Sequence, residues 1–295
     1  MKISIQSWVS GCTLPLRERL RLFKNAGFDT YDASVYEEIK EGGAFFGADY
    51  LAKAHAFRAY ADELGIACNQ AHAPFGARSI YNNPDNAEAL EDFRLSMEIS
   101  AVLGASAIVI HPTKPKPIRF VEDPELSFAE NIRFYRKLIP YAKQYGIKIA
   151  IENMWEYSNG AHVPGDSMCS RAKDFCRLLD ELDSEHVVGC LDIGHVQLVA
   201  ADIPTFIRTM GNKRLRALHV HDVDGVHDIH TLPYLSKVDY GAVCRALGEI
   251  GYEGDLTFEA CGFFARFPEK LLPAAMRFMY ETGVHLVREI DRARQ

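Results

Sequence analysis

Four side chains that could bind a cation stand at matched places in the second half of the chain. Glu152, Asp192, His219 and Glu259 each end a short apolar run: KIAIE, VVGCLD, LRALH and GDLTFE. We expect these runs to be parallel strands, whose carboxyl ends meet at one edge. Three carboxylates and an imidazole suit a divalent cation, and burying them without one would be unfavourable. The sequence therefore predicts a metal-dependent enzyme.

A second set of polar residues surrounds these four and could hold further metal ions or contact a substrate. Its members are His72 in NQAHAP, His111 in IVIHPT, His195 in LDIGH, Asp228 and His230 in HDIH, and Trp155. We expect His195 to contact the substrate, because a sharp turn after Asp192 would direct it toward the site. The sequence thus predicts a broad polar pocket around the proposed metal ion.

One histidine competes with His219 as the metal ligand. His221 lies two residues further along, so on an extended strand both side chains share a face. We prefer His219 and keep His221 as the alternative. The remaining histidines fall on helical or loop patterns, and we expect them to be solvated: His55, His162, His186, His227 and His285.

The segments that must position these residues alternate between strand-like and helix-like patterns. Strand-like runs begin near Lys2, Phe28, Ala67, Ser106, Lys148, Val187, Leu215 and Asp255. Helical patterns separate them, and several end in a glycine suited to a left-handed C-cap. Eight such units predict an α/β fold, a (β/α)8 TIM barrel forming a single domain over residues 1–295. A doubly wound open sheet is the alternative, but it would gather its ligands at one switch point.

Aromatic residues gather in the segments that follow the predicted strands. They are Tyr36, Phe45, Phe46, Phe75, Tyr81, Trp155, Tyr157, Phe263, Phe264 and Phe267. At one face they would form an apolar rim that docks a small substrate, although ordinary loop packing explains some of them. The run HPTKPKPIRF adds Lys114, Lys116 and Arg119, which could hold a phosphate or carboxylate but are more simply interpreted as solvated charges.

Composition narrows the functional classes. The net charge is −7, with 33 basic and 40 acidic residues, which makes nucleic acid an unlikely partner. Seven scattered cysteines without a CxxC pair predict structural thiols in a reducing cytoplasm. We find no secretion signal and no apolar run of the roughly 20 residues that span a bilayer, so we expect a cytoplasmic protein without a membrane partner. P-loop, GxGxxG and GxSxG patterns are also missing from the sequence.

On these motifs the chain resembles the xylose isomerase-like TIM barrel superfamily, which includes sugar phosphate isomerase/epimerases. The matching pieces are IEN with Glu152, LDIGH with Asp192, the HxxD pattern from His219, and TFEA with Glu259, in the family's order. The resemblance implies that these four residues bind one divalent ion, typically manganese, cobalt, magnesium or zinc. It also implies that the two glutamates form the catalytic acid/base pair and that His195 touches the substrate.

Two details separate the chain from particular branches of that superfamily. Gly225 stands where ketose 3-epimerases carry a substrate-gripping arginine, so their substrate contacts cannot be transferred. Conversely, five residues fall where enzymes of the endonuclease IV type hold extra zinc ions, so the ligand set has room for additional zinc. These residues are His72, His111, His195, Asp228 and His230.

We therefore expect a divalent-metal-dependent isomerase or epimerase acting on a small carbohydrate or sugar phosphate through an enediolate. Glu152 and Glu259 come from strands five and eight, so they can remove and return a proton on opposite faces of a sugar. An inosose dehydratase-like lyase on a cyclitol or keto sugar is one alternative. A zinc phosphodiesterase on abasic DNA and a non-catalytic sugar-binding or assembly subunit are the others. Such barrels often form homo-oligomers, but the sequence identifies no interface.

Overall fold

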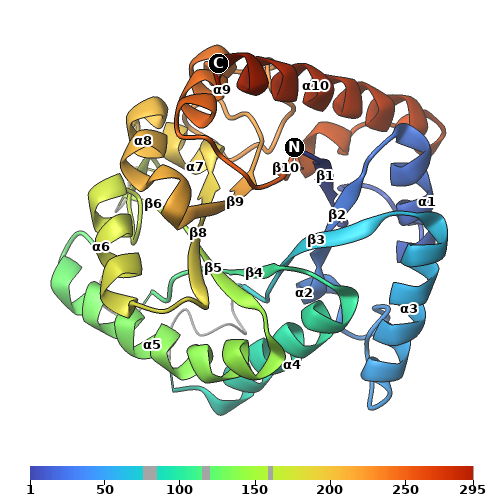
Figure 1. Cartoon of the computed structure of the whole chain (residues 1–295), viewed down its shortest axis with the longest axis horizontal. Coiled ribbons are helices and arrows are strands. Elements are labelled where there is room, and N and C mark those ends of the chain that lie inside the picture. The colour runs from blue at the N-terminus through green and yellow to red at the C-terminus, as the bar shows by residue number, and fades with distance from the viewer. Residues whose placement is uncertain (76–84, 115–119, 159–161, 295) are drawn as a thin grey trace.

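Eight parallel strands form a closed barrel in a computed structural model that describes residues 1–75, 85–114, 120–158 and 162–294 (Figure 1). Their order is β10-β1-β2-β3-β4-β5-β8-β9, and Val220, just after β9, pairs with Phe258 of β10 to close the ring. The predicted TIM barrel is confirmed and the open-sheet alternative is wrong. The strands are β1 (Ile3–Gln6), β2 (Thr30–Ser34), β3 (Ala67–His72), β4 (Ala107–Ile110), β5 (Lys148–Glu152), β8 (Val187–Asp192), β9 (Leu215–His219) and β10 (Leu256–Phe258).

Helices surround the barrel and connect its strands (Figure 1). They are α1 (Leu16–Ala26), α2 (Val35–Glu38), α3 (Tyr50–Leu64), α4 (Ala87–Leu103), α5 (Pro124–Tyr145), α6 (Ala172–Leu182), α7 (Ile193–Leu198), α8 (Ile203–Arg214), α9 (Tyr240–Glu249) and α10 (Leu272–Ala293). The 3-10 turns η2 (Cys261–Phe264) and η3 (Glu269–Leu271) follow β10. A hairpin that the sequence did not predict, β6 (Trp155–Tyr157) with β7 (Pro164–Asp166), follows β5.

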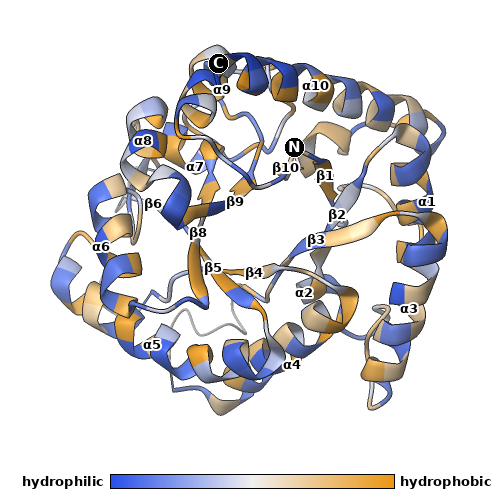
Figure 2. Cartoon of the chain, viewed as in Figure 1, coloured by the Kyte–Doolittle hydropathy of each residue, from blue (hydrophilic) through white to orange (hydrophobic). Residues whose placement is uncertain are grey.

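The apolar core has two parts that differ in side-chain size, and the smaller side chains inside the barrel leave room for a site. Between strands and helices pack large side chains such as Phe23, Phe134 and Phe175, none of them exposed to solvent. Figure 2 shows hydrophobic colour on the strands and on helix faces turned toward them. Inside the barrel the apolar cluster consists of smaller residues: Ala107, Val109, Ala150, Val188, Cys190 and Ala217.

The rest of the barrel interior is filled by a chain of polar side chains beneath the strand ends. Asn69 Nδ2 donates to Thr257 Oγ1 at 3.0 Å, and that hydroxyl donates to Gln70 Oε1 at 3.3 Å. Gln70 Nε2 in turn donates to Asp32 Oδ2 at 2.9 Å. Because buried polar groups need partners, this network fixes the register of β2, β3 and β10 under the site.

The described helices include none that is both long and apolar enough to cross a membrane. The seven cysteines are free thiols.

Gly248→Ala should destabilise the protein by about 1–3 kcal/mol, because overpacking in a close helix contact forces backbone shifts. An added Cβ would lie 2.5 Å from Ala293 Cβ and 2.6 Å from the Ile290 carbonyl oxygen, where α9 meets α10. Denaturant unfolding measures the effect. Gly241→Ala is the control in the same helix, since its nearest neighbours are side-chain atoms at 3.2 and 3.5 Å and no backbone atom approaches it as closely as in Gly248. Equal unfolding free energies for the two variants would contradict the close approach.

Candidate metal centre

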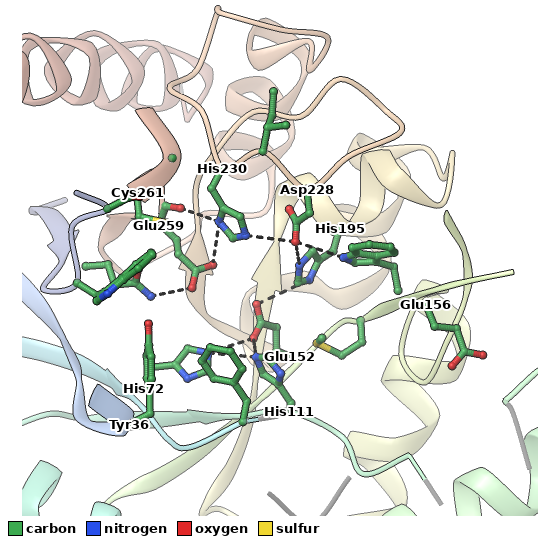
Figure 3. A pocket seen from close by; sticks show the side chains of 18 of the residues that line it. Tyr36, His72, His111, Glu152, Glu156, His195, Asp228, His230, Glu259 and Cys261 are labelled. Atoms are coloured by element: carbon green, nitrogen blue, oxygen red, sulfur yellow. Dashed lines mark hydrogen bonds and ion pairs between the residues drawn. The ribbon is translucent and has the colours of Figure 1, made fainter. Parts of the chain in front are cut away.

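The four residues singled out first in the sequence converge at the carboxyl end of the barrel. Figure 3 shows two of them, Glu152 and Glu259, with surrounding histidines. Glu152, Asp192 and His219 are the last residues of β5, β8 and β9, and Glu259 directly follows β10. Each offers one ligand atom, and these atoms all lie within 4.8 Å of one another. His219 Nδ1 is 2.9 Å from Glu152 Oε1 and 3.1 Å from Glu259 Oε2. That they bind a metal remains a prediction.

All four side chains of this quartet are buried. Within the described ranges, the ion-pair partners of its carboxylates are histidines, and no lysine or arginine reaches them. Burial opposes ionisation of Glu152, but the His219 and His111 imidazoles hold the pKa of this carboxyl well below its usual range. Such concentrated buried negative charge is what a divalent cation would compensate.

Three histidines around the quartet are held in one tautomer by the backbone. In each ring Nδ1 lies 2.8 Å from a carbonyl oxygen, so this nitrogen must carry the hydrogen and donate it. A neutral ring then presents a bare Nε2, which is how metal-binding histidines are usually oriented. The three bonds run from His72 to Ala73, from His195 to Asn153, and from His230 to Glu259.

The freed nitrogens face further acceptors rather than donors. His72 Nε2 is 3.1 Å from His111 Nε2, which lies 2.8 Å from Glu152 Oε2. His195 Nε2 and His230 Nε2 are 3.3 and 3.2 Å from Asp228 Oδ2. Besides a group of His72, His219 and Glu259 that overlaps the quartet, two further groups bring ligand atoms within 4.8 Å of one another: His72, His111 and Glu152, and His195, His221, Asp228 and His230. The donor chemistry fits a cation in each group.

His221, the alternative ligand, occupies a different position from His219. Its Nε2 lies 2.8 and 3.0 Å from the two oxygens of Asp192, so the ring donates to that carboxylate. The ring also stacks on His230, with centroids 4.0 Å apart and an interplanar angle of 15°. His221 thus orients Asp192, whereas His219 faces both glutamates. This arrangement favours the predicted choice of His219.

Three residues that the sequence analysis did not single out hold the quartet in place. Gln6 Nε2 donates to Glu259 Oε1 at 2.8 Å. Asn153 accepts from the backbone N–H of Asp192 at 2.7 Å and donates to its carbonyl at 2.9 Å, which locks β5 to β8. The sequence signal for Asn153 was its place in the IEN motif, directly after Glu152.

The third is Asp32, a fully buried carboxylate on β2. Its Oδ2 lies 3.4 Å from His219 Nε2, on the side of the ring opposite the glutamates, and its Oδ1 has no hydrogen-bond partner. His219 Nε2 has no hydrogen-bond partner in this structure, so the contact with Asp32 is an ion-pair contact only. A carboxylate at this position would favour hydrogen on Nε2, which leaves Nδ1 to face the quartet. An aspartate inside the strand run TYDAS was the sequence signal that could have identified it.

A cavity of about 640 Å³ opens above the quartet. Of the expected rim aromatics, Tyr36, Phe75, Trp155 and Tyr157 line it. The expectation is wrong for five others, because Phe45 and Phe264 are buried in the core, and Phe46, Phe263 and Phe267 lie outside the lining. Tyr81, Lys116 and Arg119 fall outside the described residues. The lining also includes Trp8, Met154, Ile229 and Cys261, which the sequence analysis did not assign to it.

Lys114 and the histidines expected to be solvated complete the comparison with expectation. Lys114 lines the cavity, and its Nζ donates to the carbonyl oxygen of Trp155 at 3.0 Å. The other histidines lie away from the cavity lining, and all but the half-buried His186 are exposed: His55, His162, His227 and His285.

Sequence comparison links the chain to carbohydrate enzymes. A family model described as Xylose isomerase-like TIM barrel matches residues 20–282. An uncharacterized protein y4fM of Sinorhizobium fredii is 23% identical over 83% of this chain and 80% of its own length. Fructoselysine 3-epimerase of Escherichia coli O157:H7 is 23% identical over 61% of this chain, and the match spans 62% of that enzyme.

Solved structures share the same architecture over almost the whole chain. The IOLI protein with a bound zinc atom has a TM-score of 0.77 at 20% identity, covering 98% of this chain and 99% of its own. A D-tagatose 3-epimerase-like protein has a TM-score of 0.74 at 19% identity and covers 100% of both chains. At these identities the structural likeness establishes the fold.

Asp32→Asn should lower the affinity for Mn²⁺ by about 10- to 100-fold, the usual effect of removing a partner of a metal-binding histidine. The amide keeps the shape but loses the charge that fixes the ring of His219. Calorimetric titration of Mn²⁺ into metal-depleted protein measures the change. Asp29→Asn, an exposed acid just before β2, is the matched control and should bind like the parent. Unchanged affinity in Asp32→Asn would show that this carboxylate does not position His219.

Proposed function

The chain belongs to the xylose isomerase-like TIM barrel family, and we propose that it is a divalent-metal-dependent carbohydrate epimerase or isomerase. The observation that carries this proposal is the buried pair Glu152 and Glu259, which flank the His219 imidazole at 2.9 and 3.1 Å beneath the cavity. The names of the fructoselysine and tagatose epimerase relatives support a sugar as the substrate.

One divalent ion, manganese, cobalt, magnesium or zinc, would be held by Glu152, Asp192, His219 and Glu259. Oxygen donors with one imidazole suit all four metals. When bound, the ion would act as a Lewis acid that stabilises negative charge on a substrate carbonyl oxygen. The zinc atom in the IOLI structure supports a metal in a barrel of this kind.

The two glutamates would move the substrate proton. Gln6 holds Oε1 of Glu259, which leaves Oε2 directed toward His219, and Glu152 approaches the same ring from β5. One carboxylate removes a proton from the carbon beside the carbonyl, and the other returns a proton from the opposite face, which inverts that carbon. His72 and His195, held by their Nδ1–H groups, direct Nε2 toward substrate hydroxyls.

The fate of the enediolate determines the reaction within this class. Proton return to the same carbon gives epimerisation, and return to the neighbouring carbon gives aldose–ketose isomerisation. Departure of a hydroxyl gives the dehydratase-like lyase on a cyclitol or keto sugar. The same two glutamates serve all three reactions, because each begins with removal of the same proton.

Exchange of a substrate C–H proton with solvent deuterium tests this proposal directly. We expect exchange with at least one member of a panel of ketoses, aldoses, inososes and their phosphates in the presence of Mn²⁺ or Co²⁺. Mass spectrometry measures the deuterium that each compound takes up. Glu259→Gln and Glu152→Gln should each slow exchange by about 10²–10⁴-fold, because an amide cannot accept the proton. Glu249→Gln, on the far end of α9 and paired with Arg208, should exchange like the parent. Full exchange in both amide variants at unchanged metal content would contradict the acid/base roles.

A second candidate function is favoured by the two further ligand groups. His72 and His111 with Glu152, and His195 and His230 with Asp228, together with the quartet, could hold several zinc ions. Such a multinuclear site suits in-line hydrolysis of a phosphodiester, as in enzymes acting on abasic DNA. The net charge of −7 opposes binding to a phosphate backbone.

Metal stoichiometry separates the two candidates. The carbohydrate enzyme requires one equivalent of metal for full activity and has no affinity for a duplex containing an abasic site. Elemental analysis of the zinc-reconstituted protein and an electrophoretic binding assay measure both quantities. Two or three equivalents of zinc together with cleavage of the abasic duplex would assign the chain to the phosphodiesterases instead.

A further inference from the structure

The cavity is larger than a single sugar requires. Its volume is about 640 Å³. A hexose at the packing density of organic crystals occupies roughly 200 Å³. A sugar placed over Glu152 and Glu259 would therefore leave most of the cavity open toward the mouth. The cavity therefore has room for a second group attached to the sugar.

The part of the lining away from the quartet is aromatic on two sides. On one side Tyr36 packs on Phe75 with centroids 4.6 Å apart, and Phe75 stacks on His111 at 5.2 Å and 24°. On the other, Trp155 and Tyr157 meet edge-to-face at 4.7 Å. Phe75 is 45% and Tyr157 is 47% exposed. Exposed aromatic surface gathered in a cavity indicates a binding site for an apolar group.

Trp155 is fixed from three directions, which makes it a preformed surface. Its Nε1 donates to Asp228 Oδ2 at 3.3 Å, and its carbonyl oxygen accepts from Lys114 Nζ at 3.0 Å. Its backbone also pairs with Asp166 in the hairpin of β6 and β7. A side chain already ordered in the free protein loses little entropy when a ligand stacks on it.

The charges of the lining favour a neutral substituent. Among the described lining residues Lys114 is the one lysine or arginine, and its Nζ is engaged with the Trp155 carbonyl. Phosphate and carboxylate groups are typically gripped by guanidinium pairs or clustered donors, and this lining contains no arginine in its described part.

We propose that the substrate is a keto sugar that carries an uncharged aromatic or apolar substituent, such as an aryl glycoside, rather than a free monosaccharide or a sugar phosphate. The sugar lies over Glu152 and Glu259, and the substituent stacks on the aromatic walls that include Trp155 and Phe75. This inference rests on the proposed function of the same site, to which it adds the class of substrate.

The chain offers a direct reporter of occupancy, because its two tryptophans, Trp8 and Trp155, both line the cavity. Intrinsic fluorescence is titrated with phenyl β-D-glucopyranoside and with methyl β-D-glucopyranoside, two unreactive probes that differ only in the substituent. We expect the phenyl compound to quench or shift the emission with at least ten-fold tighter binding. Equal affinities, or a preference for the methyl compound, would overturn the proposal.

Calorimetric titration of variants then assigns the preference to the aromatic wall. Trp155→Ala should reduce the phenyl preference to less than about three-fold while binding of the methyl compound changes little. Phe278→Ala removes an aromatic side chain that is 56% exposed on α10, outside the cavity, and should keep the full preference. If the double variant Trp155→Ala/Phe75→Ala still prefers the phenyl compound to the same extent, the aromatic walls are not the cause of the preference.

Deuterium exchange with a free 3-keto glucose and with its phenyl glycoside distinguishes failure of this inference from failure of the proposed function. A higher kcat/KM for exchange of the glycoside supports both. Equal kcat/KM for the two compounds overturns the substrate class and leaves the epimerase proposal intact. Phenyl-selective binding without exchange of either compound supports the substrate class and counts against the reaction.

Discussion

Buried negative charge is the constraint on which this molecule depends. Glu152, Asp192 and Glu259 converge inside the mouth of the barrel, and Asp228 lies beside them. Carboxylates in such a place are unstable unless positive charge meets them. Histidines surround these carboxylates, and backbone carbonyls hold three of the rings by Nδ1, so that in the neutral ring the Nε2 lone pair faces inward. This is the arrangement that a cation would require.

The barrel provides the rigidity that such a site needs. Small side chains inside the ring leave space for a hydrogen-bonded network that runs from Asn69 through Thr257 and Gln70 to Asp32, directly beneath His219. Asn153 ties the strand that bears Glu152 to the strand that bears Asp192. Ligands held by side chains that are themselves held retain their geometry when substrate binds.

The sequence was sufficient to predict which residues converge at the site but not the residues that support them. Glu152, Asp192 and His219 were recognisable because each acidic or imidazole group ends an apolar strand, a local pattern. The roles of Gln6 and Asp32 depend on register between strands far apart in sequence. The pairing of β2 with β3 is irregular, because Tyr31 pairs with Cys68 but Asp32 pairs with Gln70, and this register, which brings Gln70 to Asp32, cannot be inferred from either strand alone. For the same reason Phe45 was assigned to the rim, although it packs against Phe57 in the core.

The most direct test of the account is a crystal structure of the protein grown with Mn²⁺, with anomalous diffraction recorded to locate the ion. The account predicts an anomalous peak bounded by Glu152, Asp192, His219 and Glu259, with coordinating distances close to 2.0–2.3 Å. A crystal structure at saturating Mn²⁺ in which these four side chains point apart, with no anomalous peak between them, would contradict it.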